Sequence, residues 1–151
     1  MVPIIRTMME WNLRSNVADV LSLGPRTSAK LLRLRVQTVG HLLGAKPHLL
    51  SVRLADAAIS WKTIACWQRE AKLRVELPHL DPSAARILAI AEFSSPGRIA
   101  RCSPTELVAA LEQLDGEQKQ SVGWTRNSLP DFGEVSHWIA CAQKKVKDRV
   151  A

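Results

Sequence analysis

A glycine and three cations near the start of the chain have the types and spacing of a phosphate-binding site. Arg26, Lys30 and Arg33 follow Gly24, and at about 100° per residue they fall on one narrow face of a helix. The unpaired amides and the dipole of a helix N-terminus attract an anion, and glycine lets the backbone approach it closely. The pattern predicts contacts with a nucleic-acid backbone. The alternative is an ordinary solvated basic face.

The helix that carries these cations belongs to an internal repeat, because residues 21–54 recur at residues 78–111 with a constant offset of 57. The matching positions are apolar, Pro and Gly residues, which set a backbone path: Leu23, Pro25, Leu31, Gly40, Pro47, Leu50 and Leu54 match Leu80, Pro82, Leu88, Gly97, Pro104, Leu107 and Leu111. Residues 64–66 recur at 139–141 with an offset of 75. The change of offset predicts an insertion of 18 residues between Leu114 and Asp131.

Helical signals dominate the whole chain and predict an all-α protein of two tandem units of short helices. The expected helices are residues 17–21, 27–35, 39–44, 47–55, 61–73, 83–91, a short stretch after Ser95, 104–114 and 133–149. Their starts are marked by capping residues or by prolines, namely Asn16, Pro25, Thr38, Pro47, Ser60 and Ser95. We expect Leu31, Leu32, Trp61, Trp67, Cys66 and Cys141 to face the core.

The expected domains are an N-terminal extension at 1–16, a first unit at 17–75 and a second unit at 76–151 with an inserted loop at about 115–130. Charge divides them. Residues 17–74 hold ten Lys and Arg against three Asp and Glu, a net of +7, whereas residues 75–151 hold nine against ten, a net of −1. Such asymmetry indicates a charged partner on the first unit and a more structural role for the second.

The segment Leu-Ser-Leu-Gly-Pro-Arg-Thr-Ser-Ala-Lys-Leu-Leu at residues 21–32 resembles a helix-hairpin-helix motif. That family joins two helices by a Gly-hydrophobic-Gly turn whose backbone amides bind a DNA phosphate. Here the turn is Ser22-Leu23-Gly24, so the second glycine is present and the first is serine. Residues 36–43 and 46–50 resemble the linker helices of tandem units, and an eroded second hairpin is expected at 55–60. The chain resembles bacterial helix-hairpin-helix domains of unknown function over residues 17–113 and 131–146.

The resemblance implies that the first unit binds duplex DNA through its phosphate backbone, without sequence specificity and without catalysis. Leu23, Gly24 and Arg26 would supply backbone amides. Arg26, Lys30 and Arg33 would supply charge, within a motif completed by Pro25 and Thr27. Further cations extend this surface if the fold gathers them: Arg35, Lys62 and Arg69.

The second copy departs from the motif, because His79 and Asp81 replace its glycines and a carboxylate repels phosphate. This hairpin is expected not to bind DNA. The departures also favour an alternative function as a protein-interaction scaffold or adaptor, which would use the second unit and the inserted loop with Trp124. Binding of RNA is a third alternative, and the lack of exposed aromatic candidates in the basic unit argues against it.

The composition limits the classes of function that this chain can have. A pI near 9.8 suits nucleic acid or another anionic partner. No apolar run is long enough for a membrane span, and the first residues lack the features of a signal peptide. Three widely spaced cysteines favour a reduced, cytoplasmic chain. No catalytic, metal-binding or cofactor motif is evident, so we expect neither an enzyme nor a cofactor. Base-excision glycosylases share the hairpin but are longer and carry a catalytic Asp beyond it.

Overall fold

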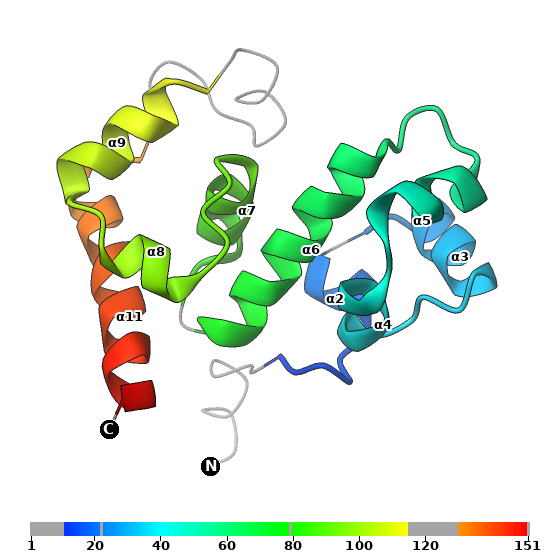
Figure 1. Ribbon diagram of the computed structural model, residues 1–151, viewed down its shortest axis with the longest axis horizontal. Coiled ribbons are helices and arrows are strands. Elements are labelled where there is room, and N and C mark those ends of the chain that lie inside the picture. The colour runs from blue at the N-terminus through cyan, green and yellow to red at the C-terminus, as the bar shows by residue number, and fades with distance from the viewer. Residues whose placement is uncertain (1–10, 22, 79, 115–129, 151) are drawn as a thin grey trace. The chain divides into compact units, whose positions relative to one another are not determined.

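The computed structural model describes residues 11–21, 23–78, 80–114 and 130–150, apart from the side chains of residues 149 and 150. All regular elements within these residues are α-helices, which confirms the predicted all-α class. In chain order they are α2 (Val17–Leu21), α3 (Pro25–Arg33), α4 (Val39–Gly44), α5 (Pro47–Leu54), α6 (Trp61–Glu76), α7 (Pro82–Ile90), α8 (Pro96–Ala100), α9 (Pro104–Glu112) and α11 (Phe132–Val150) (Figure 1). The chain divides into two compact units, unit 1 (Met1–Pro78) and unit 2 (His79–Ala151).

The helices of unit 1 begin at the residues that the sequence marks. Side-chain oxygens of Asn16, Thr38 and Ser60 each accept a backbone N–H from the first turn of α2, α4 and α6. Pro25 and Pro47 occupy the first turn of α3 and α5. The capping side chains thus bind an amide that has no acceptor within the helix, and the prolines have no such amide to satisfy.

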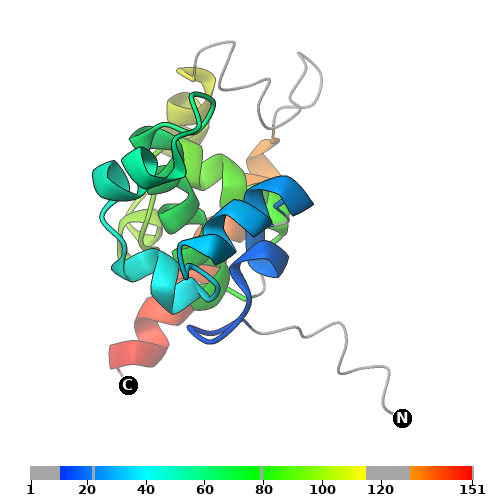
Figure 2. The same ribbon diagram turned by 90° about the vertical axis from the view of Figure 1, so that its right-hand side faces the viewer.

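The long helix α6 organises unit 1, because α2, α4 and α5 all pack against it (Figures 1 and 2). Polar side chains of α6 also complete the ends of the shorter helices. Nε2 of Gln68 donates to the carbonyl oxygens of Leu42 and Ala45, both at 2.9 Å. A guanidinium nitrogen of Arg74 donates to the carbonyl oxygen of Val20 at 2.8 Å. Arg74 thus binds a carbonyl of α2, and Gln68 adds a second hydrogen bond at the end of α4, where the Leu42 carbonyl also accepts the amide of Ala45.

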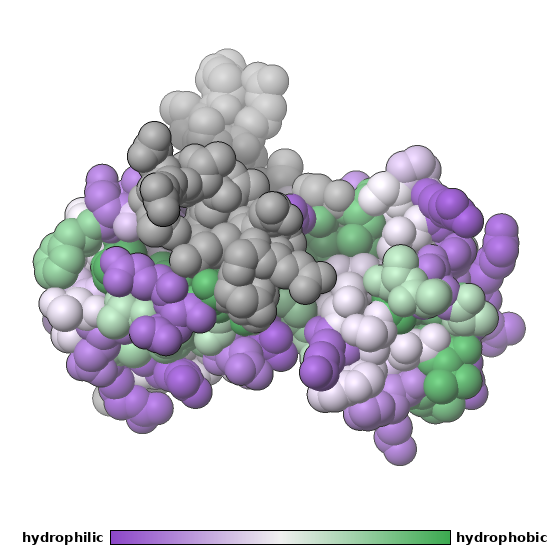
Figure 3. Space-filling view, turned by 90° about the horizontal axis from the view of Figure 1, so that it is seen from above, coloured by the Kyte–Doolittle hydropathy of each residue, from purple (hydrophilic) through white to green (hydrophobic). Residues whose placement is uncertain are grey.

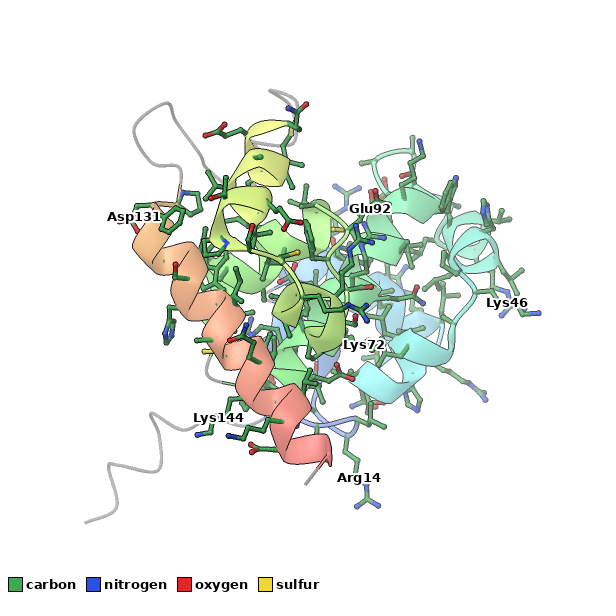
Figure 4. The ribbon with its side chains drawn as sticks, turned by 60° about the vertical axis from the view of Figure 1, so that its left-hand side comes forward. Arg14, Lys46, Lys72, Glu92, Asp131 and Lys144 are labelled. Atoms are coloured by element: carbon green, nitrogen blue, oxygen red, sulfur yellow. The ribbon has the colours of Figure 1, made fainter. Side chains whose placement is uncertain are left out.

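Unit 2 repeats this order of elements. Its helices α7, α8 and α9 begin 57 residues after α3, α4 and α5, which is the offset of the sequence repeat. The long helix α11 packs against α8 and α9, as Figure 4 shows. Buried side chains recur at matching positions: Leu31 and Leu88, Leu42 and Ile99, Leu50 and Leu107, Leu54 and Leu111, and Ile64 and Ile139. The repeat therefore preserves the core.

Both units also close α3 and α7 with the same strained turn. Arg35 has a φ of 65° and Glu92 a φ of 67°, the left-handed region that side chains other than glycine rarely occupy. The next residue then donates its amide back into the helix, from Val36 to the oxygen of Leu31 and in the same way in unit 2, each at 2.9 Å. The turn inserts Val36 and Phe93 into their cores, which offsets the backbone strain.

Four side chains that we expected to face the core lie elsewhere. Leu32 is 57% exposed, because α3 buries the side on which Leu31 lies and Leu32 is about 100° further round the helix. Trp61 is 40% exposed and stacks on His48, with ring centroids 4.4 Å apart. Unit 1 thus carries an exposed aromatic side chain, contrary to the expectation that the basic unit has none. Cys66 and Cys141 are half-buried rather than core residues. Leu31 is fully buried, and Trp67 packs on the core as predicted.

Helix ends differ from the expectations by a few residues, as at α3, which ends at Arg33, and α6, which continues to Glu76. Nearly all of the predicted insertion, including Trp124, and most of the N-terminal extension lie outside the described residues.

Because Glu92 holds a left-handed backbone, Glu92→Gly is expected to stabilise the protein by about 0.5–1 kcal/mol by removing steric strain. Urea unfolding would measure the change. The matched control is Ala109→Gly on the exposed face of α9, which is expected to cost about 1 kcal/mol. A loss of stability in Glu92→Gly similar to that of the control would show that the turn is not strained.

Candidate nucleic-acid interface

The turn between α2 and α3 leaves the N-terminus of α3 open. Gly24 is its N-cap residue, with φ −67° and ψ 161°, and no side chain caps the helix. A Cβ added at Gly24 would meet no atom within 4 Å. The amide and the hydroxyl of Ser28 both donate to the carbonyl oxygen of Gly24, which fixes the first turn. Because any residue can adopt this φ, the backbone conformation does not require glycine at position 24. The absence of a side chain there matters because it leaves the N-terminus of α3 accessible to a ligand.

One of the three amides expected to bind phosphate is already used. The N–H of Leu23 donates to the carbonyl oxygen of Ala18 at 3.0 Å, so Leu23 shapes the turn instead of binding an anion. Among the described residues, the amides of Gly24, Arg26 and Thr27 have no hydrogen-bond acceptor. These three amides form the open N-terminus of α3, where the helix dipole favours an anion.

The basic stripe on α3 is only partly available. Arg26 and Arg33 are exposed, whereas Lys30 is half-buried. Nζ of Lys30 lies 2.7 Å from Oδ2 of Asp56, and the two side chains are 24% and 25% exposed. The stripe therefore presents two exposed cations on either side of an ion pair. This pair could not be predicted from local sequence patterns, because Asp56 lies 26 residues further along the chain.

Asp56 comes from the turn between α5 and α6, the segment expected to be an eroded second hairpin. Its Oδ1 accepts the N–H of Ala58 at 2.9 Å, which closes the turn. The hydrogen bond from Lys30, then that from Ala58, hold the pKa of the Asp56 carboxyl below its ordinary value of 3.8, and the charge of Arg26 adds to this effect. The fold thus brings an acidic turn against the basic helix.

The other expected cations do not gather on this stripe as a group. Arg35 follows the C-terminal end of α3, the end opposite to Gly24, and lines a separate hollow. Nζ of Lys62 lies 5.8 Å from the centroid of the Trp61 ring at the start of α6. Arg69 is half-buried further along α6. The candidate interface is therefore the region around the turn and the exposed face of α3.

The hollow at the C-terminal end of α3 has a volume of about 550 Å³. It is bounded by α4 and α5, and its lining includes four basic side chains: Arg35, His41, Lys46 and Arg53. This hollow is not among the sites expected from the sequence. A usable signal was present, because Lys46 and Arg53 stand where unit 2 has Ser103 and Ala110.

The corresponding turn of unit 2 has the opposite electrostatic character. Asp81 is the N-cap residue of α7 and occupies the position of Gly24, with φ −58° and ψ 139°. Its carboxylate is exposed at the helix N-terminus. Acidic side chains stabilise this end of a helix and repel phosphate there.

Other kinds of site find no support in the described part of the chain. Within it, no three His, Cys, Asp or Glu side chains gather in a way that could hold a metal ion. None of the described helices combines the length and apolar character needed to cross a bilayer.

Residues 21–145 match the model of a family described as Domain of unknown function (DUF4332). No curated protein and no solved structure matches the chain. The match covers both units, from the end of α2 into α11.

Because of the Lys30–Asp56 pair, we expect the free energy of unfolding to decrease at acidic pH. Because the folded-state pKa of Asp56 is lowered, the pair stabilises the fold above the ordinary pKa and loses its effect as pH falls through the folded-state value. Carboxyl NMR should show Asp56 titrating below 3.8, and Lys30→Met should raise its pKa toward that value. Lys62→Met is the control and should leave it unchanged. If the pKa of Asp56 were the same in Lys30→Met as in the wild type, the pair would not form in solution.

Proposed function

The chain belongs to the DUF4332 family of domains of unknown function, and we propose that its unit 1 binds duplex DNA through the phosphate backbone. The binding is independent of sequence and involves no catalysis. The α2–α3 turn and the exposed face of α3 form the contact surface, as the resemblance to a helix-hairpin-helix motif implies.

The internal repeat carries this proposal, because it supplies a control within the same chain. Both copies conserve the core, yet only the first has an open glycine N-terminus followed by exposed cations. Gly24, Arg26 and Arg33 of unit 1 stand where unit 2 has Asp81, Ser83 and Ile90. Since packing does not require these differences, a surface function of unit 1 accounts for them.

The proposed contact has two parts. The open amides at the start of α3 and the helix dipole bind one phosphate oxygen. Arg26, which follows Gly24 directly, adds a charge-assisted hydrogen bond, and Arg33 lies about two turns further along the same helix to meet a second phosphate. Contacts of this kind position the protein on DNA and do not distinguish bases. With one functional turn, binding is weak and depends strongly on salt.

Asp56 acts against the same interaction. Its carboxylate neutralises Lys30 and lies in the field of Arg26. The pair orients the α5–α6 turn against α3 but reduces the attraction for a polyanion. In this proposal Asp56 limits the strength of backbone binding.

An adaptor function of unit 2 and the inserted segment is the second candidate from the sequence. Its central residue, Trp124, lies outside the described residues, and the geometry of unit 2 adds no observation in its favour.

Gly24→Asp tests the phosphate site directly, because it installs the residue that unit 2 carries at this position. The fold should tolerate it, since a Cβ there meets no atom and Asp is a favoured N-cap residue. We expect affinity for a mixed-sequence duplex to fall about tenfold or more, which corresponds to about 1.4 kcal/mol. Fluorescence anisotropy across a salt titration measures it, with circular dichroism to check folding.

Gly97→Asp in α8 is the matched control, because it adds the same charge at another open glycine and should have little effect. Duplex binding that survives Gly24→Asp, or absence of wild-type binding at low salt, would rule out this site.

Asp56→Asn is expected to strengthen duplex binding severalfold. The amide oxygen can still accept the N–H of Ala58, while Lys30 and Arg26 lose their neutralising partner. One more phosphate contact would steepen the dependence of log affinity on log salt by about 0.9. Asp131→Asn in unit 2 serves as control. Weaker binding by Asp56→Asn would mean that the pair positions the site instead of masking it.

A further inference from the structure

A second surface of unit 1 combines exposed apolar side chains with cations and lies away from the α2–α3 turn. On α5, Leu49 is 48% exposed and Val52 is 75% exposed. His48, on the same helix, stacks against the exposed ring of Trp61. Hydrophobic residues reach the surface of unit 1 between hydrophilic ones in Figure 3, on the right. Exposed apolar side chains that gather on one helix indicate a contact surface.

Leu49 also lines the hollow of about 550 Å³, which joins this face to a basic rim. Arg35, Lys46 and Arg53 are exposed around the hollow, and no Asp or Glu of the described residues lines it. Figure 4 shows Lys46 extending outward from the start of α5. Apolar and basic groups therefore meet at one concave site, whose lining also includes the aliphatic side chains of Leu34 and Leu50.

The repeat shows that the fold does not require this composition. In unit 2 the start of α9 is a capping box, in which the Ser103 side chain accepts the N–H of Glu106 and Glu106 accepts that of Ser103. The corresponding residues of α5 are Lys46 and Leu49, and Lys46 makes no side-chain cap. Helix α5 thus lacks the stabilising cap that α9 has, and it exposes an apolar side chain at the matching position.

Two further positions on α5 follow the same trend. Val52 and Arg53 stand where α9 has Ala109 and Ala110. Compared with α9, α5 therefore has a cation in place of the cap residue. It also has an exposed aliphatic side chain and a second cation in place of two alanines. Packing does not account for these changes, because the buried Leu50 and Leu54 match Leu107 and Leu111.

We propose that α5 and the adjoining hollow bind an acidic amphipathic segment of a protein partner. Leu49 and Val52 receive its apolar side chains, as in helix-in-groove recognition. The cations at the rim pair with its carboxylates, which sets specificity and the rate of encounter. The aliphatic lining of the hollow favours a peptide over stacked bases. The site lies at the opposite end of α3 from Gly24 and does not depend on DNA binding by the turn.

Binding can be measured with the full chain and a fluorescein-labelled synthetic peptide of about 15 residues, with Leu at helical i, i+3 and i+4 spacing and Glu elsewhere. Two control peptides separate the contributions. One carries Lys in place of Glu, and the other carries Ser in place of Leu. We expect saturable binding of the acidic amphipathic peptide and at least about tenfold weaker binding of either control.

The decisive variant is Lys46→Ser with Leu49→Glu, which gives α5 the capping box of α9. It should fold at least as well as the wild type, and peptide affinity should fall about tenfold or more. Lys144→Glu on α11 changes the net charge by the same amount and is the matched control (Figure 4). Duplex binding by the double variant should fall much less than with Gly24→Asp.

Three results would overturn the proposal. The first is no saturable binding of the acidic peptide, and the second is an equal loss of peptide binding in the double variant and in the Lys144→Glu control. The third is loss of peptide binding in Gly24→Asp together with full competition by duplex DNA. The last result would assign both ligands to one anion site at the turn. Failure of duplex binding alone would leave the peptide site standing.

Discussion

Packing of short helices against one long helix is the constraint on which unit 1 depends. Helices α2 to α5 have five to nine residues, too few to be stable alone in water. Contact with α6 buries the apolar faces of α2, α4 and α5, and hydrogen bonds from Gln68 and Arg74 complete the carbonyl ends of α4 and α2. The same dependence explains why both copies of the repeat end in a long helix.

Once that core is fixed, the outward faces are free to diverge. Unit 2 uses this freedom for stability, with a capping box at α9 and Asp81 at the start of α7. Unit 1 has neither feature at the matching positions and instead exposes Gly24, Lys46 and Leu49. Both proposed surfaces therefore lie where unit 1 lacks a stabilising feature that unit 2 has at the matching position.

Local sequence signals predicted the candidate site only in part. Gly24, Arg26 and Arg33 could be assigned because a helix start and a spacing of three or four residues fix which side chains share a face. The pairing of Lys30 with Asp56 could not be predicted, since it joins two turns that are distant in the sequence. Nor could the exposure of Leu32 and Trp61, because helical periodicity gives a relative orientation and not the direction of the core.

The sequence by itself determined the helical class, the starts of the helices, the repeat of 57 residues and the concentration of positive charge in the first unit. These follow from caps, prolines, apolar spacing and composition, which act over a few residues or need no geometry at all. Tertiary structure decided which cations remain exposed, which amide of the α2–α3 turn is already bonded, and that Arg35, Lys46 and Arg53 surround one hollow. The physical reason is that charge neutralisation and concavity depend on distances between segments, and only the packing of the core sets those distances.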